Sequence, residues 1–485
     1  MTKITTVRNY INGEWIDPSG KDIRKGYNPA DKREQVFSFT ESTEEDTKYA
    51  IDSAAEAFKT WKKTTAPQRG EYLYRIAELM EEKKDELARV IVLEEGKTYT
   101  DAEKEVGYAA GIVKFYAGAY RRIKGTLQEA DLPNIQIETK PEPLGVVLVV
   151  TPWNFPLSIP AWKTAPAIAS GNTAVLKASS ETPLTVMKFM EIIELAGVPK
   201  GVVNNVLAPG KLVSSMINHK AVKAVTFTGS NSVGKKIYAE AAKDMKRCLL
   251  EMGGKNPLIV MEDADIDEAV EITAGGTFGQ TGQACTATGR VIVHKDIVDA
   301  FTKKLVEKTE SLKVGHGMDE GIDMGPQVNQ SELESTLELI ESAKEEGAKI
   351  LTGGKAPEGE YYEHGYFIEP TVITDVESSM RIAQEEVFGP VSNIITVSDI
   401  EKAIEVANDV DFGLSSAICT RNFDYINKAL DEIEAGIIKI NMTTTGTFFQ
   451  APFGGYKQSS TGTYKELGSE ALEFYCQYKT RYIKN

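Results

Sequence analysis

Apolar positions along the chain follow two spacings, and each spacing predicts one kind of element. Between residues 41 and 124 the three- and four-residue spacing of an amphipathic helix dominates, most clearly in 46–61 and 66–95. From residue 145, short and continuously apolar runs alternate with amphipathic stretches. The runs that predict buried strands are 145–150, 173–177, 202–206 and 224–228, and the stretches that predict helices are 158–169, 183–196, 212–218 and 232–244.

The repeated order of strand, helix and strand implies parallel strands joined by right-handed crossovers, and therefore an open sheet covered on both faces. A second set of this kind begins after Glu251, with its clearest strands at 257–260, 290–293 and 436–441. Two isolated stretches, 135–140 and 471–483, alternate over part of their length and could pair with each other or with another subunit. The pattern predicts an α/β protein with two doubly wound domains.

Composition supports this division and restricts the partners. A chain of 485 residues is too long for one ordinary core. Lys and Arg number 55 against 71 Asp and Glu, a net charge of −16, so we expect neither nucleic acid nor membrane as a partner. No run approaches the roughly 20 apolar residues of a membrane helix. Residues 1–15 lack the order of a secretory signal, and we expect a cytoplasmic protein.

Cysteine and histidine residues are few and scattered. The four cysteines lack CxxC spacing, so the sequence predicts neither a disulfide framework nor a metal site. Cys285 lies in a stretch rich in Gly and Gln, 279–287, directly before a predicted strand. Its small neighbours leave room for a ligand to approach the sulfur, as a nucleophile requires. The alternative is a buried, inert thiol, which is the commoner case for a lone cysteine.

Two polar residues stand at the ends of predicted buried strands. Glu251 ends the apolar run 248–251, where partial desolvation would raise the pKa of its carboxyl toward the range of a general base. The alternative is a solvated glutamate at a strand end. Asn154 follows the first central strand, at the edge where open α/β sheets bind ligands, and its amide could donate to an oxyanion. The alternative is an asparagine that shapes a turn between two prolines.

A glycine-rich turn, Phe227-Thr-Gly-Ser-Asn-Ser-Val-Gly234, joins a predicted strand to a predicted helix. The start of a helix suits a pyrophosphate, because its free backbone N–H groups point at the anion. The turn lacks the Gly-x-Gly-x-x-Gly spacing of the usual dinucleotide fingerprint. By itself, it also fits an ordinary connection between strand and helix.

Together and in this order, the motifs resemble the aldehyde dehydrogenase superfamily along nearly the whole chain. The motifs that carry the resemblance are Pro152-Trp-Asn-Phe-Pro156, Lys177, Phe227-Thr-Gly-Ser230, Leu250-Glu-Met-Gly-Gly-Lys255, Gly282-Gln-Ala-Cys285, Glu385-Glu-Val-Phe-Gly-Pro390 and Pro452-Phe-Gly-Gly455. The stretches 281–288 and 450–460 look most like the branch that acts on 2,5-dioxopentanoate (2-oxoglutarate semialdehyde). Neighbouring branches use succinate semialdehyde, glyceraldehyde or glycolaldehyde.

The resemblance implies a role for each matching residue. Cys285 would attack the aldehyde and pass through a thiohemiacetal to a thioester, with Asn154 and the Cys285 N–H holding the oxyanion. Glu251 would be the base that activates water for hydrolysis of the thioester. Lys163 and Glu466 match positions that relay protons from this base, with a structural ion pair as the alternative. The implied cofactor residues are Thr151, Pro152, Trp153, Lys177, Ser179, Ser180, Gly210, Gly229, Ser230, Gly234, Gly253, Glu386 and Phe388. The implied lining of the substrate pocket is Phe155, Trp162, Ala284, Thr286 and Phe453.

Cofactor choice has a local signal three positions after Lys177. Many NAD-preferring relatives carry Glu there, whose carboxylate would repel a 2′-phosphate, whereas this chain has Ser180. Since Lys177 and Ser179 can bind the phosphate, we expect NADP to be preferred and NAD to be possible.

Substrate choice has a weaker signal. Succinate semialdehyde enzymes often carry Arg in the helix after Asn154, where this chain has Trp162 and Lys163, so a guanidinium fork for a carboxylate is missing. We expect 2,5-dioxopentanoate or a related semialdehyde as substrate. Glyceraldehyde, glycolaldehyde or a broad range of aldehydes is the alternative.

The resemblance also divides the chain into parts. It implies a Rossmann-like cofactor domain from 1–122 and 145–252, a catalytic domain from 253–445, and an oligomerisation arm from 123–144 and 465–485. The arm would extend the sheet of a neighbouring subunit and give a homotetramer built as a pair of dimers. The presence of Glu251, a base useful for hydrolysis, disfavours a CoA-acylating enzyme, in which CoA rather than water meets the thioester. The joint presence of nucleophile, base and oxyanion donor disfavours a non-catalytic protein on the same fold.

Overall fold

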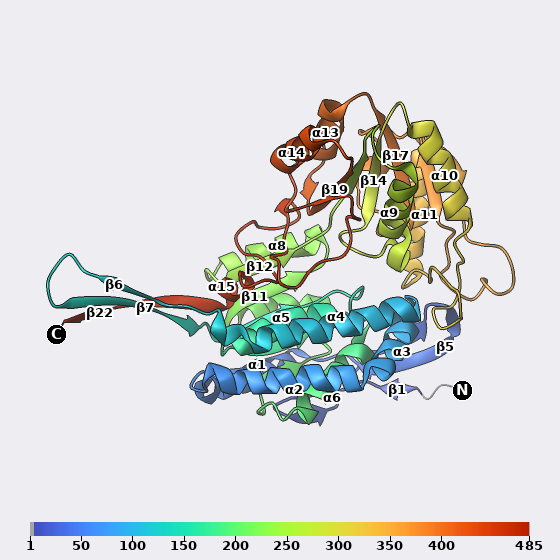
Figure 1. Cartoon of the computed structure of the whole chain (residues 1–485). Helices are drawn as coiled ribbons and strands as arrows, with labels where there is room; N and C mark the ends of the chain where they lie inside the picture. The colour runs from blue at the N-terminus through green and yellow to red at the C-terminus, as the bar shows by residue number, and fades with distance from the viewer. Residues whose placement is uncertain (1–3, 485) are drawn as a thin grey trace.

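Two open sheets of seven strands each form the frame of the structure, a computed structural model that describes residues 4–484 (Figure 1). The first sheet has the strand order β12-β11-β8-β9-β10-β2-β3. Its first five strands are parallel, and β2 and β3 add an antiparallel edge. The strands are β2 (Asn9–Ile11), β3 (Glu14–Ile16), β8 (Val146–Val150), β9 (Thr173–Lys177), β10 (Val203–Asn205), β11 (Val222–Thr228) and β12 (Arg247–Glu251).

The second sheet has the order β15-β16-β17-β14-β13-β19-β20, with β15 antiparallel to its neighbour and the other strands parallel. Its strands are β13 (Asn256–Val260), β14 (Thr288–His294), β15 (Lys349–Thr352), β16 (Thr371–Thr374), β17 (Val391–Val397), β19 (Ser415–Cys419) and β20 (Ile437–Ile440). The chain passes from the first sheet to the second between Glu251 and Asn256. We propose the boundary of the two large domains in this short segment.

Helices cover both faces of both sheets. They are α1 (Glu44–Trp61), α2 (Ala66–Glu82), α3 (Lys84–Glu95), α4 (Tyr99–Ala117), α5 (Ser158–Ala169), α6 (Pro183–Leu195), α7 (Val213–Asn218), α8 (Asn231–Ala242), α9 (Ile266–Phe278), α10 (Val298–Glu310), α11 (Gln330–Glu345), α12 (Arg381–Gln384), α13 (Ile400–Asn408), α14 (Phe423–Glu432) and α15 (Ala471–Tyr475). Short 3₁₀ turns are η1 (Ala119–Arg121), η2 (Gly210–Leu212) and η3 (Gly279–Gly282). Within the described residues, every helix is too short or too polar to cross a membrane.

Alternation along each buried strand explains why both faces need a cover, since successive side chains point to opposite sides. In β8, Val147 joins the core under α2, α4 and α5, whereas Val146 and Leu148 join the core under α1 and α8. In β13, Ile259 packs with residues of α11 and α13, and Leu258 packs with residues of α9 and α10. The predicted doubly wound α/β architecture is confirmed.

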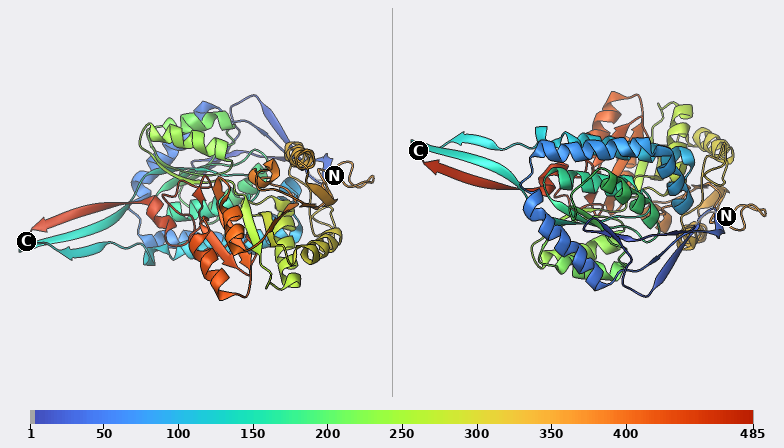
Figure 2. Two further views of the ribbon diagram at one scale, coloured as in Figure 1. Left: turned by 90° about the horizontal axis from the view of Figure 1, so that it is seen from above. Right: turned by 90° about the horizontal axis from the view of Figure 1, so that it is seen from below.

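Three antiparallel strands form a long arm that projects from the body of the molecule (Figures 1 and 2). They are β6 (Thr126–Glu129), β7 (Ile135–Pro143) and β22 (Cys476–Lys484). Strand β22 pairs with β7 from Cys476 opposite Pro143 to Lys484 opposite Ile135, so the two isolated stretches pair with each other. The stretch expected to alternate from residue 471 begins instead with α15, and residues 465–475 lie against the body with Leu467 and Phe474 fully buried.

Two features differ from the predicted pattern. The helical periodicity over 66–95 belongs to two helices, because the backbone leaves the helical region at Lys83 (φ −102°, ψ 19°). A small sheet of β1 (Thr5–Thr6), β5 (Asp31–Thr40) and β4 (Ile23–Asn28) was not predicted, since charged residues interrupt the apolar alternation of its strands. A last strand pair joins β18 (Phe412–Gly413) to β21 (Tyr456–Lys457).

Candidate active site

Cys285 opens onto a cavity of about 500 Å³, which is lined by residues from both halves of the chain. The walls come from α4, the start of α5, the end of α9 and the loop 445–447. All five residues expected in a substrate pocket line it together with Cys285: Phe155, Trp162, Ala284, Thr286 and Phe453. Trp162 and Phe453 face each other with ring centroids 5.7 Å apart. The structure therefore brings the predicted nucleophile and the predicted pocket residues to one place.

A strained turn before Cys285 carries the thiol to this cavity. Gln280 and Thr281 adopt left-handed conformations with φ of 53° and 59°, and Gly282 follows with φ of 68°. A side chain at Gly282 would place its Cβ 2.2 Å from the carbonyl oxygen of Gly389, so this position requires glycine. The close contact docks the cysteine loop on the segment that carries Glu386 and Phe388. Non-glycine residues in the left-handed region cost free energy and often mark functional sites.

Hydrogen bonds hold the backbone of Cys285, and its surroundings keep the thiol protonated. The Asn256 side chain donates to the carbonyl oxygens of Cys285 (2.9 Å) and Ala287 (2.8 Å). Burial, followed by the nearby carboxyls of Glu386 and Glu251, raises the pKa of the Cys285 thiol well above its usual range. In this conformation the sulfur therefore needs a base before it can act as a nucleophile.

Glu251 stands at the end of β12 with only 1% of its surface exposed. Its Oε1 accepts a hydrogen bond from the Ser460 hydroxyl at 3.2 Å, and its Oε2 has no hydrogen-bond partner within residues 4–484. Burial and the neighbouring Glu466 raise the pKa of Glu251 well above its ordinary value, opposed by Lys163 and Lys465. A buried carboxyl with a free oxygen and a raised pKa has the properties of a general base.

Lys163 and Glu466 form a buried ion pair beside this carboxyl. The Lys163 ammonium donates to Glu466 Oε1 and, at 2.9 Å, to the hydroxyl of Thr226. Burial lowers the pKa of Lys163 and raises the pKa of Glu466, which brings the proton affinities of the partners closer. Both interpretations of the pair, a structural ion pair and a proton relay, fit this geometry.

Asn154 lies beyond β8 and contacts the cysteine loop directly. Its side-chain amide donates to the carbonyl oxygen of Gln283 at 2.9 Å, two residues before Cys285. An amide NH₂ group has two hydrogens, so the second one remains for another acceptor. Its backbone carbonyl accepts a hydrogen bond from Lys97 at 2.8 Å. Lys97 was not predicted as a site residue, and neither was Ser460 beside Glu251.

Most of the predicted cofactor residues follow the carboxyl ends of parallel strands, which meet at one edge of the first sheet. Thr151, Pro152 and Trp153 follow β8, Lys177 ends β9 with Ser179 and Ser180 after it, Gly210 begins η2 after β10, Gly229, Ser230 and Gly234 follow β11, and Gly253 follows β12. At this edge the buried hydroxyls of Thr151 and Thr228 lack hydrogen-bond partners among residues 4–484, as does Glu251 Oε2. The Lys177 ammonium is near the charge of Glu41 and makes no hydrogen bond among the same residues. Burial lowers the pKa of Lys177 to about 8.

Glu386 and Phe388 come from the second sheet's domain and close this edge. Glu386 accepts the Gly254 N–H at 3.0 Å, and a Cβ at Gly253 would lie 2.1 Å from Glu386 Oε2, so glycine permits the approach. Burial raises the pKa of Glu386 to about 7. Phe388 packs edge-on against Trp153, with ring centroids 5.4 Å apart. The unpartnered cation and hydroxyl, the start of α8 and this aromatic pair fit a dinucleotide laid across the strand ends.

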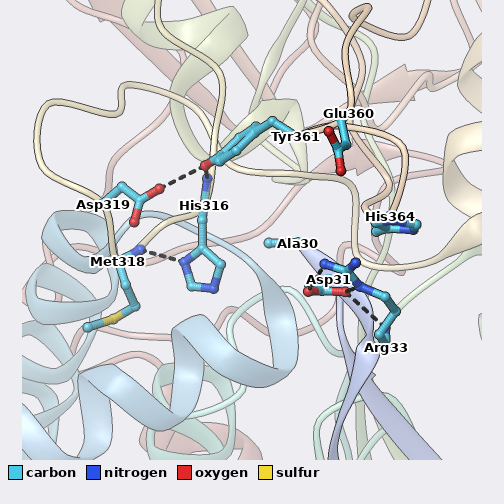
Figure 3. A pocket seen from close by; sticks show the side chains of 9 residues that line it. All are labelled: Ala30, Asp31, Arg33, His316, Met318, Asp319, Glu360, Tyr361 and His364. Atoms are coloured by element: carbon cyan, nitrogen blue, oxygen red, sulfur yellow. Dashed lines mark hydrogen bonds and ion pairs between the residues drawn. The ribbon is translucent and has the colours of Figure 1, made fainter.

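A second cavity of about 480 Å³ lies apart from these residues (Figure 3). The turn between β4 and β5 and two later loops enclose it. The Tyr361 hydroxyl accepts the His316 N–H and donates to Asp319, both at 2.8 Å, and Asp31 pairs with Arg33. These polar groups bind one another, and the lining shares no residue with the Cys285 cavity.

Comparison with known proteins agrees with the motifs and with the fold. The sequence pattern of the aldehyde dehydrogenase family matches residues 15–481. An α-ketoglutarate semialdehyde dehydrogenase of Haloferax volcanii is 46% identical over 98% of each chain. A 2,5-dioxopentanoate dehydrogenase of Saccharolobus solfataricus is 45% identical over 97% of this chain and 98% of its own. The solved structure of a Staphylococcus aureus betaine aldehyde dehydrogenase in complex with NAD⁺ has a TM-score of 0.95 at 37% identity, covering 98% of this chain and 94% of that one.

These matches span the whole described fold at identities well above those that show a fold alone. They confirm the predicted family, and they confirm an enzyme over the non-catalytic alternative. The chain belongs to the aldehyde dehydrogenase family and is an oxidoreductase that acts on aldehydes.

Proposed function

We propose that this enzyme oxidises 2,5-dioxopentanoate to 2-oxoglutarate with NADP and water, through a thioester on Cys285. The observation that carries the proposal is that Cys285 lines a cavity, with Asn154 bonded to the cysteine loop and Glu251 close enough to affect the thiol's pKa. The chain is also 45–46% identical over nearly its whole length to relatives named for this substrate. The aldehyde carbon is oxidised by two electrons and the cofactor accepts them as a hydride, so the balanced reaction to the ionised 2-oxoglutarate releases two protons.

The proposed chemistry begins at the sulfur. Glu251 removes the thiol proton, directly or through a water, because the pKa of Cys285 is raised by burial. The thiolate adds to the aldehyde carbon, and the oxygen that becomes negative is held by the Asn154 amide and the Cys285 N–H. A bound nicotinamide would supply the acceptor for the hydride of the former aldehyde carbon. Loss of that hydride converts the adduct on Cys285 into a thioester.

Hydrolysis follows at the same centre. Glu251 accepts a proton from the water that attacks the thioester, and the carboxylic acid leaves as Cys285 regains its proton. We propose that Lys163 and Glu466 carry protons from Glu251, since both lie buried within its electrostatic reach.

The proposed cofactor site consists mainly of residues that follow the carboxyl ends of the first sheet's strands, together with Glu386 and Phe388. Lys177, Ser179 and Ser180 bind the adenosine ribose and its 2′-phosphate, and Ser230 at the start of α8 binds the pyrophosphate. Glu386 binds the nicotinamide ribose, with Phe388 and Trp153 beside the ring. The remaining members, Thr151, Pro152, Gly210, Gly229, Gly234 and Gly253, shape the groove.

Ser180→Glu should reverse the cofactor preference. The new carboxylate would lie beside the 2′-phosphate, and we expect kcat/KM with NADP to fall about 100-fold, with little change for NAD. Absorbance of the reduced cofactor measures both. Ser180→Ala is the matched control, which removes the hydroxyl without adding charge and should cost only a few-fold. A wild-type enzyme with much higher kcat/KM for NAD than for NADP would contradict the proposed preference.

The cavity offers groups for a short oxo acid. Apolar rings lie near Cys285, and the lining also includes the Tyr108 and Thr447 hydroxyls, which bond to each other at 2.6 Å. Among the described lining residues, Lys104 is the one cation. Its ammonium pairs with Asp101 of the same lining at 3.4 Å, so the two hydroxyls are the groups that suit the oxygens of an oxo acid, and the planar fork of arginine is missing.

A panel of aldehydes tests the substrate. It contains 2,5-dioxopentanoate, succinate semialdehyde, glyceraldehyde and glycolaldehyde, each with NADP and with NAD. We expect 2,5-dioxopentanoate to lead by about 10-fold or more in kcat/KM, the discrimination that a shaped pocket gives between close analogues. A lead by a short hydroxyaldehyde would leave the dehydrogenase intact and overturn the proposed substrate. Faster turnover with added CoA would instead indicate an acylating enzyme.

We also propose a cytoplasmic homotetramer assembled through the arm. Strands β22 and β6 form the two edges of the arm sheet, and Tyr478, Tyr482 and Leu127 are exposed on it. Exposed edges with apolar side chains favour pairing with another chain. The four cysteines are free thiols, as is usual in a reducing compartment. Light scattering in solution measures the number of subunits.

A further inference from the structure

A buried ion pair at the start of α4 lies outside the chemistry described so far. Lys97 and Glu105 are 0% and 4% exposed, and the Lys97 ammonium donates to Glu105 Oε2 at 2.8 Å. Glu95, also fully buried, lies 3.9 Å from the same ammonium. Taking such charges out of water is costly unless further hydrogen bonds satisfy them. The other hydrogen bonds that Lys97 and Glu105 make therefore indicate the role of the pair.

Both partners bind the backbone of one segment, the turn between β8 and α5. Lys97 donates to the carbonyl oxygen of Asn154 at 2.8 Å, and its ammonium lies 4.5 Å from the centre of the Phe155 ring. Glu105 Oε1 accepts the N–H groups of Leu157 and Ser158, each at 3.0 Å. The pair thus holds the middle of the turn, at Asn154, and its end at the start of α5.

The sequence of the turn limits the hydrogen bonds that the turn can make by itself. Pro152 and Pro156 have no N–H to donate, and Leu157, the residue before α5, makes no side-chain capping bond. The first N–H groups of a helix need outside acceptors, and a carboxylate there also interacts well with the helix dipole. Glu105 supplies that acceptor from α4, and Lys97 fixes the carbonyl of the residue that bears the proposed oxyanion donor.

We propose that the Lys97–Glu105 pair is a positioning device that sets the Asn154 amide relative to Cys285. This inference rests on the proposed oxyanion role of Asn154. The Asn154 side chain is already tied to the cysteine loop through Gln283, so its backbone is held by α4 and its amide by the loop. Glu105 also lines the Cys285 cavity, but its two oxygens are bound, Oε2 to Lys97 and Oε1 to the N–H groups of Leu157 and Ser158. Lys97 acts through the carbonyl of Asn154.

Lys97→Met should lower kcat about 10- to 100-fold and change the KM for the aldehyde little. Loss of the bond to Asn154 lets the turn shift, and a displacement near 1 Å can cost about 100-fold in rate. Lys114→Met, an exposed lysine on the last turn of α4, is the matched control and should leave kcat unchanged.

A double-mutant cycle separates positioning from a general loss of structure. Asn154→Ala alone should lower kcat about 100- to 1000-fold, as expected for an oxyanion donor. If Lys97 acts through Asn154, Lys97→Met should cost nearly nothing further in the Asn154→Ala background. An equal loss in both backgrounds would overturn the positioning role alone. Full activity of Asn154→Ala would overturn the oxyanion role, and the inference with it.

Lys97→Met leaves buried carboxyls without their cation and could prevent folding. A second variant therefore tests the same proposal without the unpaired charge of Glu105. Lys97→Met with Glu105→Gln removes both charges, and the Gln oxygen can still accept from Leu157 and Ser158. Thermal unfolding of this double variant checks that it folds. We expect it to show the same loss of kcat as Lys97→Met. Wild-type kcat in the folded double variant would overturn the proposal.

Discussion

Cys285→Ser should lower kcat/KM for aldehyde oxidation by about 10⁴-fold or more while cofactor binding stays intact. A serine hydroxyl at this position is far less acidic than a thiol and a weaker nucleophile, and loss of a nucleophile removes the covalent route entirely. The side chain lines the cavity, and among residues 4–484 its sulfur makes no hydrogen bond that serine would break. Reduced-cofactor absorbance gives the rate, and titration calorimetry with NADP gives the affinity.

Cys419→Ala is the matched control for this substitution. Cys419 is a buried free thiol on β19 in the second sheet, outside the Cys285 cavity. Its replacement by alanine should leave kcat/KM near the wild-type value, with a small loss of stability from the cavity. Substantial activity in Cys285→Ser would show that the nucleophile has been assigned to the wrong residue, even though the family stands.

Glu251→Gln should separate the two halves of the reaction. Acylation should slow, since Glu251 also takes the thiol proton, but it would still yield up to one equivalent of reduced cofactor per active site, and the following turnovers should be slower still, by about 10²- to 10⁴-fold relative to the wild type, for want of a base. Because Glu251 must be ionised to act and burial raises its pKa, the wild-type rate of hydrolysis should rise with pH through that raised pKa. The variant should lack this rise. Stopped-flow absorbance shows the burst, and steady-state rates against pH show the profile.

Glu262→Gln is the control, since Glu262 is an exposed glutamate just beyond β13 and makes no contact with the cavity. It should keep the wild-type pH profile. A Glu251→Gln enzyme that turns over at the normal rate without a burst would assign the hydrolytic base elsewhere. Slow acylation with no burst would instead indicate that Glu251 serves mainly to deprotonate Cys285.

A residue's place in the fold can be predicted from the sequence when its neighbours along the chain create its environment. The central strands β8 and β9 are buried on both faces, so their apolar runs stand out, and their bounds are predicted within a residue. Cys285 and Asn154 stand in motifs with a recognisable neighbourhood. The carboxyl-end rule accounts for the place of Asn154 after β8, whereas Cys285 precedes β14 of the second sheet, so the contact through Gln283 was not predicted from spacing.

The positioning pair could not be predicted in the same way. Lys97 and Asn154 are 57 positions apart, and nothing in the spacing of charges near Lys97 shows that its ammonium is fully buried. The one local signal is the run Glu94-Glu95-Gly-Lys97 between two helical patterns, where a solvated turn is the ordinary interpretation. Strand β5 was missed because seven of its ten residues are charged or polar and reach the surface, which hides its apolar alternation.

Packing of the last helix against the first domain has a consequence for synthesis of the chain. Leu467 and Phe474 fill the core shared by α2, α4 and α5, and Asn172 donates to the carbonyl oxygen of Tyr475 at 2.8 Å. The ribosome completes all seven strands of the first sheet by Glu251, yet this gap in the core stays open until Tyr475 emerges, roughly 10 to 45 seconds later. During that interval the nascent chain exposes apolar surface that a chaperone would recognise. The order of the elements along the gene, rather than the stability of the finished enzyme, determines how long this risk of aggregation lasts.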